Sequence, residues 1–199
     1  KHFDFALDGE ARQVARDFFQ PFEGFGERVR AGGEFPGLFS FLDGASQPEE
    51  LIEQAARLGY PALALTDHDG FYGIVRFSQA AKEHGVRAIF GAEITLEDGY
   101  HLVLLVRNGS GYANLSHLLS VAQLANKKAE AKVTYRSLAA HVDGLIALSG
   151  CQFGEIPSLL LQDHLSSALE AAQRYHEMFG DGNFYLELQH HNLPSQEKL

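Results

Sequence analysis

The chain has little cysteine, few basic residues and no long apolar run. Cys151 is the single cysteine among 199 residues, which excludes an internal disulfide framework and fits a reducing cytoplasm. No apolar run is long enough to span a bilayer and no signal-peptide pattern opens the sequence, so we expect no membrane partner. Lys and Arg number 16 against 26 Asp and Glu, a net charge of −10. Such a chain binds phosphate backbones poorly unless cations or another domain supply positive charge.

Hydrophobic residues make up 45% of the sequence, which is enough for a packed core and excludes a disordered tail. Ten histidines are many for this length and make metal chemistry a hypothesis to test. The one shift in composition is at the N-terminus, where residues 1–38 are rich in phenylalanine and glycine.

Strand-like and helix-like segments alternate along the chain. Short apolar runs predict strands at 61–66, 86–94, 100–106, 144–149 and 184–188. Helical periodicity predicts helices at 8–20, 46–58, 71–84, 114–131 and 164–179, the second opened by a capping box of Ser46 and Glu49. Asp98-Gly99 is a hairpin signal between the second and third strands. The alternation is typical of an α/β fold with a parallel sheet, either open or closed into a barrel.

Reactive side chains follow the predicted strands. Asp67, His68 and Asp69 come directly after the first strand, and Glu93 lies at the end of the second. The loops that leave the carboxyl ends of strands build the site in both versions of this fold. Three more residues follow later strands, namely Cys151, His190 and His191.

His101 opens the third strand just after the hairpin, so we expect it to approach the edge that Glu93 occupies. Carboxylate, imidazole and thiolate groups at one edge can hold divalent cations such as zinc or manganese. Metal-bound water becomes a nucleophile near neutral pH, and the cations offset phosphate charge. The pattern therefore favours phosphoester hydrolysis.

Each of these features also has a structural interpretation. Asp67 to Gly70 fits a helix N-cap with a turn glycine, Glu93 fits an exposed strand-edge charge, and Cys151 fits a small buried hydrophobe. His190 and His191 fit a solvent loop. The other histidines are interpreted as structural: His2, His84, His117, His141, His164 and His176.

Five motifs occur in a characteristic order: residues 39–46 (FSFLDGAS), 58–70 (LGYPALALTDHDG), 91–93 (GAE), 101–105 (HLVLL) and 148–151 (LSGC). In this order they resemble the PHP (polymerase and histidinol phosphatase) domain, and more narrowly the N-terminal PHP domain of bacterial C-family DNA polymerases. The first motif and residues 187–191 (ELQHH) favour the error-prone, alpha-subunit-like branch. The resemblance covers residues 39–199, while residues 1–38 have no clear counterpart.

The resemblance implies a distorted (βα)7 barrel of PHP type with divalent metal ions, Zn or Mn and in some cases Mg, at the carboxyl ends of its strands. It implies metal-ligand roles for Asp43, His68, Glu93, His101 and Cys151. Asp67 would act beside His68 in catalysis or orient it, and His190 and His191 would contact substrate. Family members with intact sites hydrolyse phosphoesters, including 3′–5′ exonuclease proofreading in some polymerases.

Two departures from the family pattern concern the metal site. A His-x-His motif is expected at positions 34 and 36, where this chain has Glu34 and Pro36, and proline has no side-chain ligand. The family's last metal motif, Asp-x-His, is expected beyond Leu199, and so are the polymerase palm, fingers and thumb. We therefore expect a piece of a longer polymerase whose barrel is incomplete and whose metal site is degraded.

The sequence thus predicts a PHP domain of an error-prone DNA polymerase, a cytoplasmic nucleotidyltransferase of replication or translesion repair. Its expected partners are DNA, through the parent polymerase, and the remaining polymerase domains. Two alternatives stay open: a non-catalytic structural platform of the same fold, and a free-standing PHP phosphatase.

Overall fold

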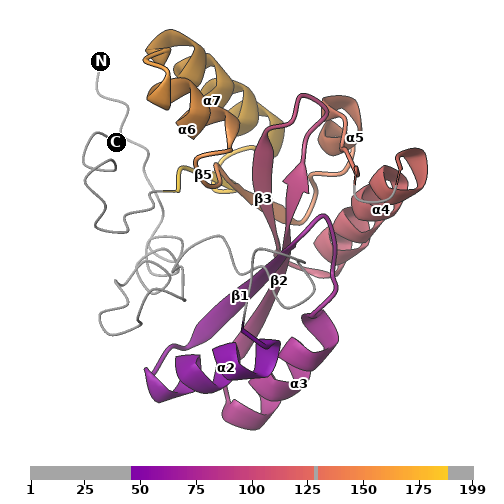
Figure 1. Ribbon diagram of the computed structural model, residues 1–199, viewed down its shortest axis with the longest axis vertical. Helices are drawn as coiled ribbons and strands as arrows, with labels where there is room; N and C mark the ends of the chain where they lie inside the picture. Colours follow the sequence, from indigo (N-terminus) through magenta and orange to yellow (C-terminus); the bar gives the residue numbers. More distant parts are fainter. Residues whose placement is uncertain (1–45, 128–129, 188–199) are drawn as a thin grey trace.

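The computed structural model describes residues 46–127 and 130–187. Helices and strands alternate through most of this part of the chain (Figure 1). The helices are α2 (Pro48–Arg57), α3 (Ile74–His84), α4 (Gly109–Ala125), α5 (Tyr135–Ala139), α6 (Glu155–Leu161) and α7 (Leu165–Phe179). The strands are β1 (Ala62–His68), β2 (Arg87–Thr95), β3 (His101–Val106), β4 (Leu145–Leu148) and β5 (Phe184–Tyr185). Within these ranges, no helix is long and apolar enough to cross a membrane.

The five strands form one sheet in the order β1-β2-β3-β4-β5. The prediction of a parallel sheet is wrong for β3, which pairs antiparallel with both β2 and β4, while β1–β2 and β4–β5 are parallel. The reason is the predicted Asp98-Gly99 turn, because a tight hairpin reverses the chain. Gly99 adopts φ +91°, a conformation that favours glycine. The α/β class is confirmed, and closure into a seven-stranded barrel stays a prediction.

The direction of β3 has a consequence for the site. Since β1, β2, β4 and β5 run the same way, their carboxyl ends lie at one edge of the sheet together with the amino end of β3. A residue that opens β3 therefore meets residues that end β1 and β2.

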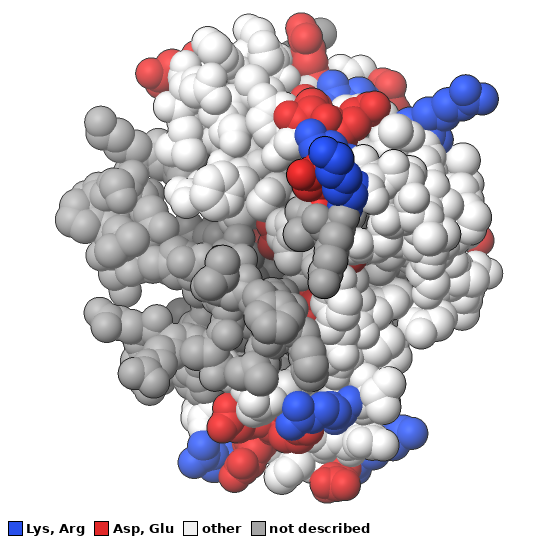
Figure 2. All heavy atoms as spheres, turned by 45° about the vertical axis from the view of Figure 1, so that its right-hand side comes forward, with Lys and Arg blue, Asp and Glu red and all other residues white. Residues whose placement is uncertain are grey.

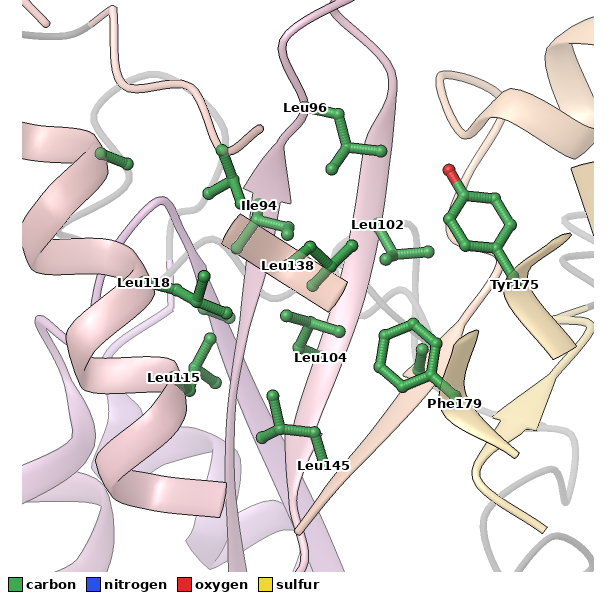
Figure 3. Packing of buried hydrophobic residues seen from close by; sticks show 14 of the residues in the cluster. Ile94, Leu96, Leu102, Leu104, Leu115, Leu118, Leu138, Leu145, Tyr175 and Phe179 are labelled. Carbon is green, nitrogen blue, oxygen red and sulfur yellow. The ribbon is translucent and has the colours of Figure 1, made fainter. Parts of the chain in front are cut away.

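Two groups of helices pack on the sheet (Figure 1). Helices α2 and α3 enclose a core with β1 that contains Ile52, Leu65 and Phe77, each fully buried. The larger core joins β2, β3 and β4 to α4, α5 and α7, and Figure 3 shows its leucines meeting Tyr175 and Phe179 of α7.

The opposite side of the central strands carries a smaller apolar cluster of Val103, Leu105 and Leu148. Because side chains alternate along a strand, these residues point away from the leucines that pack against α4 and α7. We call this side the Val103 face.

Several element boundaries differ from the predicted ones. The cap of α2 is Gln47, whose backbone N–H donates to Glu50 at 2.8 Å, so the predicted pair of Ser46 and Glu49 is wrong by one residue. Helix α4 begins at Gly109 and ends at Ala125, earlier at both ends than predicted. Helix α3 begins at Ile74, three residues later than the predicted start at residue 71. Helices α5 and α6 were not predicted, and the predicted helix at 8–20 lies outside the described residues.

Candidate metal centre

Three predicted ligands come together at the edge of the sheet described above. His68, the last residue of β1, is the register partner of Glu93 on β2. Glu93 pairs in turn with Val103 on β3, two residues from His101. The alternation of side chains therefore places Glu93 and His101 on the Val103 face. The prediction that His101 approaches the edge occupied by Glu93 is confirmed.

Glu93 is the centre of this group. Its side chain is only 5% exposed, and its Oε1 atom accepts a short hydrogen bond from His101 Nδ1. His68 Nδ1 lies 4.0 Å from the same oxygen, and the two imidazole rings meet edge to face with centroids 4.8 Å apart. One ligand atom from each of the three residues lies within 4.8 Å of the others.

This donor set fits a divalent cation. Two imidazole nitrogens and one carboxylate oxygen suit zinc or manganese, and a buried carboxylate needs a positive or hydrogen-bonding partner. Two ligand atoms of one cation with bonds of about 2.0–2.2 Å lie at most about 4.0–4.4 Å apart. His68 Nδ1 and Glu93 Oε1, 4.0 Å apart, are within this limit. Three protein ligands also leave coordination positions for water or substrate.

His68 is held by Asp69, which was predicted as one of the reactive side chains after the first strand, and by Thr95, to which sequence reasoning gave no role. Its Nε2 atom lies 3.0 Å from Thr95 Oγ1 and 3.2 Å from Asp69 Oδ2. Asp69 also binds the end of β2, since its side chain accepts from the Thr95 backbone N–H and hydroxyl. The carbonyl oxygen of Asp69 accepts from Gln123 of α4 at 2.9 Å.

Asp67 has a different environment from the one its position suggested. It is 1% exposed, and its Oδ2 atom accepts from the Gly73 backbone N–H at 2.7 Å. Gly73 is the N-cap of α3, so Asp67 fixes the turn into that helix. Successive strand residues point to opposite faces, so Asp67 points away from the face that carries His68. This bond matches the helix-cap interpretation of Asp67.

Cys151 follows β4 at the same edge of the sheet and is buried. Its Sγ atom accepts from the Phe153 backbone N–H at 3.5 Å, and the Phe153 carbonyl oxygen accepts from the His101 N–H. Its loop thus contacts the strand that carries His101. In the described ranges, the group of close ligand atoms contains His68, Glu93 and His101 and does not include Cys151.

Three other predicted site residues, Asp43, His190 and His191, lie outside the described residues. Glu34 and Pro36 also lie outside them.

A second carboxylate-centred cluster joins the helices α5, α6 and α7. Glu155 Oε2 accepts from Tyr175 Oη at 2.8 Å, from Tyr135 Oη at 3.0 Å and, in a short contact, from Arg174. The Tyr135 hydroxyl also lies 2.8 Å from Asp98 on the β2–β3 hairpin. The Arg174 guanidinium lies over both tyrosine rings, 5.2 Å from each centroid.

The protons of this second cluster are tightly held. Burial is the main cause that raises the pKa of Tyr135 and of Tyr175, and the negative charge of Glu155 acts in the same direction. Burial alone would lower the pKa of Arg174, but its hydrogen bond and ion pair with Glu155 outweigh this and raise it. Arginine and both tyrosines therefore stay protonated at neutral pH.

Comparisons with known proteins identify the family of the chain. The family model described as PHP domain matches residues 38–191. The chain is 46% identical, over 81% of its length, to an error-prone DNA polymerase of Symbiobacterium thermophilum, of which it covers 16%. It is 41% identical to an error-prone DNA polymerase of Mycobacterium bovis, over 98% of this chain and 19% of that protein. It is 37% identical to the DNA polymerase III subunit alpha of Treponema pallidum, over 81% of this chain and 15% of that protein.

The chain thus spans less than a fifth of the length of these polymerases. The family match covers most of the sequence, including the strand ends that carry His68, Glu93 and His101. On this match, the chain belongs to the PHP domain family.

Proposed function

We propose that this chain is the PHP domain of an error-prone C-family DNA polymerase. It then acts within a nucleotidyltransferase of replication or translesion repair in the cytoplasm, with DNA and the other polymerase domains as partners. The similarity to error-prone polymerases over 81% and 98% of the chain supports this assignment.

Within that enzyme, the proposed activity of the domain is metal-dependent phosphoester hydrolysis of the 3′–5′ exonuclease type. The observation that carries it is the convergence of His68, Glu93 and His101 on one buried carboxylate oxygen. A divalent cation bound there supplies positive charge for a phosphate and lowers the pKa of its bound water. His68 and His101 provide nitrogen ligands and Glu93 offsets part of the cation's charge. A chain with a net charge of −10 repels a phosphate substrate, and a cation bound at the proposed site would offset this repulsion.

The proposed centre is a reduced one. Glu34 and Pro36 occupy the positions where the family pattern has His-x-His, so we propose weak hydrolysis supported by one well-held cation. Asp43 and Cys151 keep their proposed roles as further ligands, and His190 and His191 as substrate contacts. Since the Asp67 carboxylate fixes the turn into α3, its proposed role is to orient the neighbouring His68 and not to act on substrate. Zinc and manganese match the donor set best, and magnesium prefers more oxygen ligands.

The test combines cation binding with hydrolysis by the 199-residue chain. Zn²⁺ and Mn²⁺ are titrated against wild type, His68→Ala and the control His84→Ala, which removes an exposed histidine from the end of α3. Hydrolysis of a 3′-labelled single strand and of p-nitrophenyl phosphate is then measured with each cation. We expect binding and any turnover to be lost in His68→Ala and kept in His84→Ala. Equal binding by all three proteins would contradict the proposed centre.

A second candidate function, a structural platform, is favoured by the surface of α4. The residues of this helix, Gly109–Ala125, include no Lys, Arg, Asp or Glu. Figure 2 brings the α4 side of the molecule forward and shows a broad area without charged side chains. Leu124 is 87% exposed there, and Val121 and Tyr112 are also exposed. Tight cation binding without hydrolysis of either substrate would favour the platform over the nuclease.

A further inference from the structure

Asp69 occupies an unusual place in the backbone. It follows β1 directly and has φ +49°, one of two described non-glycine residues with a left-handed backbone. Aspartate adopts this conformation more readily than most residues, but glycine would do so at lower cost. We therefore expect the Asp69 carboxylate, which glycine would not supply, to make interactions that offset the cost of this conformation.

The hydrogen bonds of Asp69 fix it from two sides. Its backbone N–H donates to the Glu93 carbonyl at 2.8 Å, and its Oδ1 atom accepts from the Thr95 N–H at 2.8 Å. Its Oδ2 atom accepts from the Thr95 hydroxyl at 2.9 Å, and Gln123 binds its carbonyl oxygen. Asp69 therefore joins the end of β1 to the end of β2 with both carboxylate oxygens in defined positions.

This arrangement determines which nitrogen of His68 carries the proton. His68 Nε2 faces Asp69 Oδ2 at 3.2 Å and Thr95 Oγ1 at 3.0 Å. The carboxylate is an acceptor, and the Thr95 hydroxyl has already given its hydrogen to Asp69, so both atoms accept from Nε2. A neutral imidazole protonated at Nε2 carries its lone pair at Nδ1, the atom that lies 4.0 Å from Glu93 Oε1.

We infer that Asp69 is a positioning residue that holds His68 in the Nε2–H tautomer and thereby presents Nδ1 as the ligand atom. The role of Nδ1 as a ligand atom rests on the proposed metal centre. The tautomer of His68 follows from the hydrogen bonds of His68, Asp69 and Thr95 alone. Partners that fix a histidine tautomer in this way typically contribute roughly 10–100-fold to metal affinity.

The experiment uses Asp69→Asn in the 199-residue chain. Asparagine also tolerates φ +49° and keeps the shape of the side chain. With its oxygen on the Thr95 N–H, its amide places a donor where Oδ2 stood, which favours the Nδ1–H tautomer of His68. The matched control is Asp163→Asn, the other described left-handed aspartate (φ +60°), which is exposed after α6.

Two measurements are made on each protein. The ¹⁵N chemical shifts of the His68 ring, assigned with His68→Gln, report the tautomer without metal at a pH where histidine is neutral. Competition with a chelator gives the Zn²⁺ affinity. We expect Asp69→Asn to move the proton toward Nδ1 and to weaken Zn²⁺ binding by roughly 10–100-fold, and Asp163→Asn to change neither.

An unchanged His68 tautomer in Asp69→Asn overturns the inference, even if affinity falls. Asp69→Gly, which accepts the same backbone conformation and has no carboxylate, replaces it if the asparagine variant does not fold, and is expected to give a mixture of tautomers. If wild type binds no Zn²⁺, the proposed centre fails, while the ¹⁵N shifts still decide the tautomer.

Discussion

Glu93 and Glu155 are two glutamates with similar burial and opposite chemistry. Their side chains are 5% and 10% exposed, and each accepts hydrogen bonds through one oxygen. Glu155 is surrounded by Arg174, Tyr135 and Tyr175, whose protons are held at neutral pH. Glu93 has two imidazoles beside it, those of His68 and His101, and imidazole is the side chain that most often binds metals in proteins. The partners of the two carboxylates, and not their burial, distinguish the Glu155 cluster from the proposed metal centre.

The two clusters also differ in what they connect. The partners of Glu155 come from α5 and α7, so this cluster ties separate helices together. The partners of Glu93 come from adjacent strands that are already held by backbone pairing. We therefore expect loss of Glu155 to reduce stability, and loss of Glu93 to reduce metal affinity.

The largest effect is expected for Glu155→Ala. This change leaves Arg174 and two tyrosine hydroxyls without their shared acceptor, which should lower the free energy of unfolding by about 2–3 kcal/mol. Urea unfolding followed by circular dichroism measures it. Glu170→Ala removes an exposed glutamate from α7 and should change stability by no more than about 0.5 kcal/mol. Equal effects of the two variants would show that the Glu155 cluster is not structural.

Glu93→Gln tests the other half of the comparison. Loss of a direct ligand should weaken Zn²⁺ binding by at least about 100-fold, more than loss of an outer partner typically costs. Unfolding without metal should change by less than about 1 kcal/mol, because the amide oxygen can still accept from His101. Chelator competition and urea unfolding give the two values. If Glu93→Gln lost as much stability as Glu155→Ala and kept its Zn²⁺ affinity, Glu93 would be a structural residue and not a metal ligand.

A smaller effect is expected at high pH. The pKa values of Tyr135 and Tyr175 are raised in the folded chain, so their protons contribute stability that is fully present below the ordinary tyrosine pKa of about 10. Above that pH the unfolded chain loses these protons while the folded chain keeps them, and stability falls as pH rises. Urea unfolding between about pH 8 and about pH 11 measures the slope.

The double variant Tyr135→Phe, Tyr175→Phe removes both hydroxyls and serves as the comparison for that slope. Its stability should fall less steeply above about pH 10 than that of wild type. An identical slope would assign the alkaline loss to other groups, of which Tyr60, whose pKa burial also raises, is one.

The positions of the strands along the chain and the edge that carries the candidate site were predictable from sequence, whereas the direction of β3 in the sheet was predicted wrongly. Apolar runs located the strands, and the Asp98-Gly99 signal located the hairpin that brings His101 to Glu93. The start of α4 was not predictable by periodicity, because Gly109, Ser110 and Gly111 are poor helix formers behind the Asn108 cap. Helices α5 and α6 are too short for a periodic pattern.

The details of both clusters depend on tertiary structure. The left-handed backbone of Asp69 has no sequence signature, because aspartate usually has negative φ. The bond from Thr95 to Asp69 follows from the register of β2 against β1, which is fixed by packing. Glu155, Tyr135 and Tyr175 meet from three elements far apart in sequence, so no local pattern predicts their contact.

In the described sheet, every strand pairs with the strand made just before or just after it. During synthesis on a ribosome, each new strand therefore finds its partner already present and does not wait for a distant segment. Such local pairing favours fast folding and leaves strand edges exposed only briefly. His68, Glu93 and His101 come from the first three strands, so they can meet as soon as β3 has emerged and paired, well before β4 and β5 are made. The residues proposed to hold the cation thus belong to the part of this sheet that a nascent chain can assemble first.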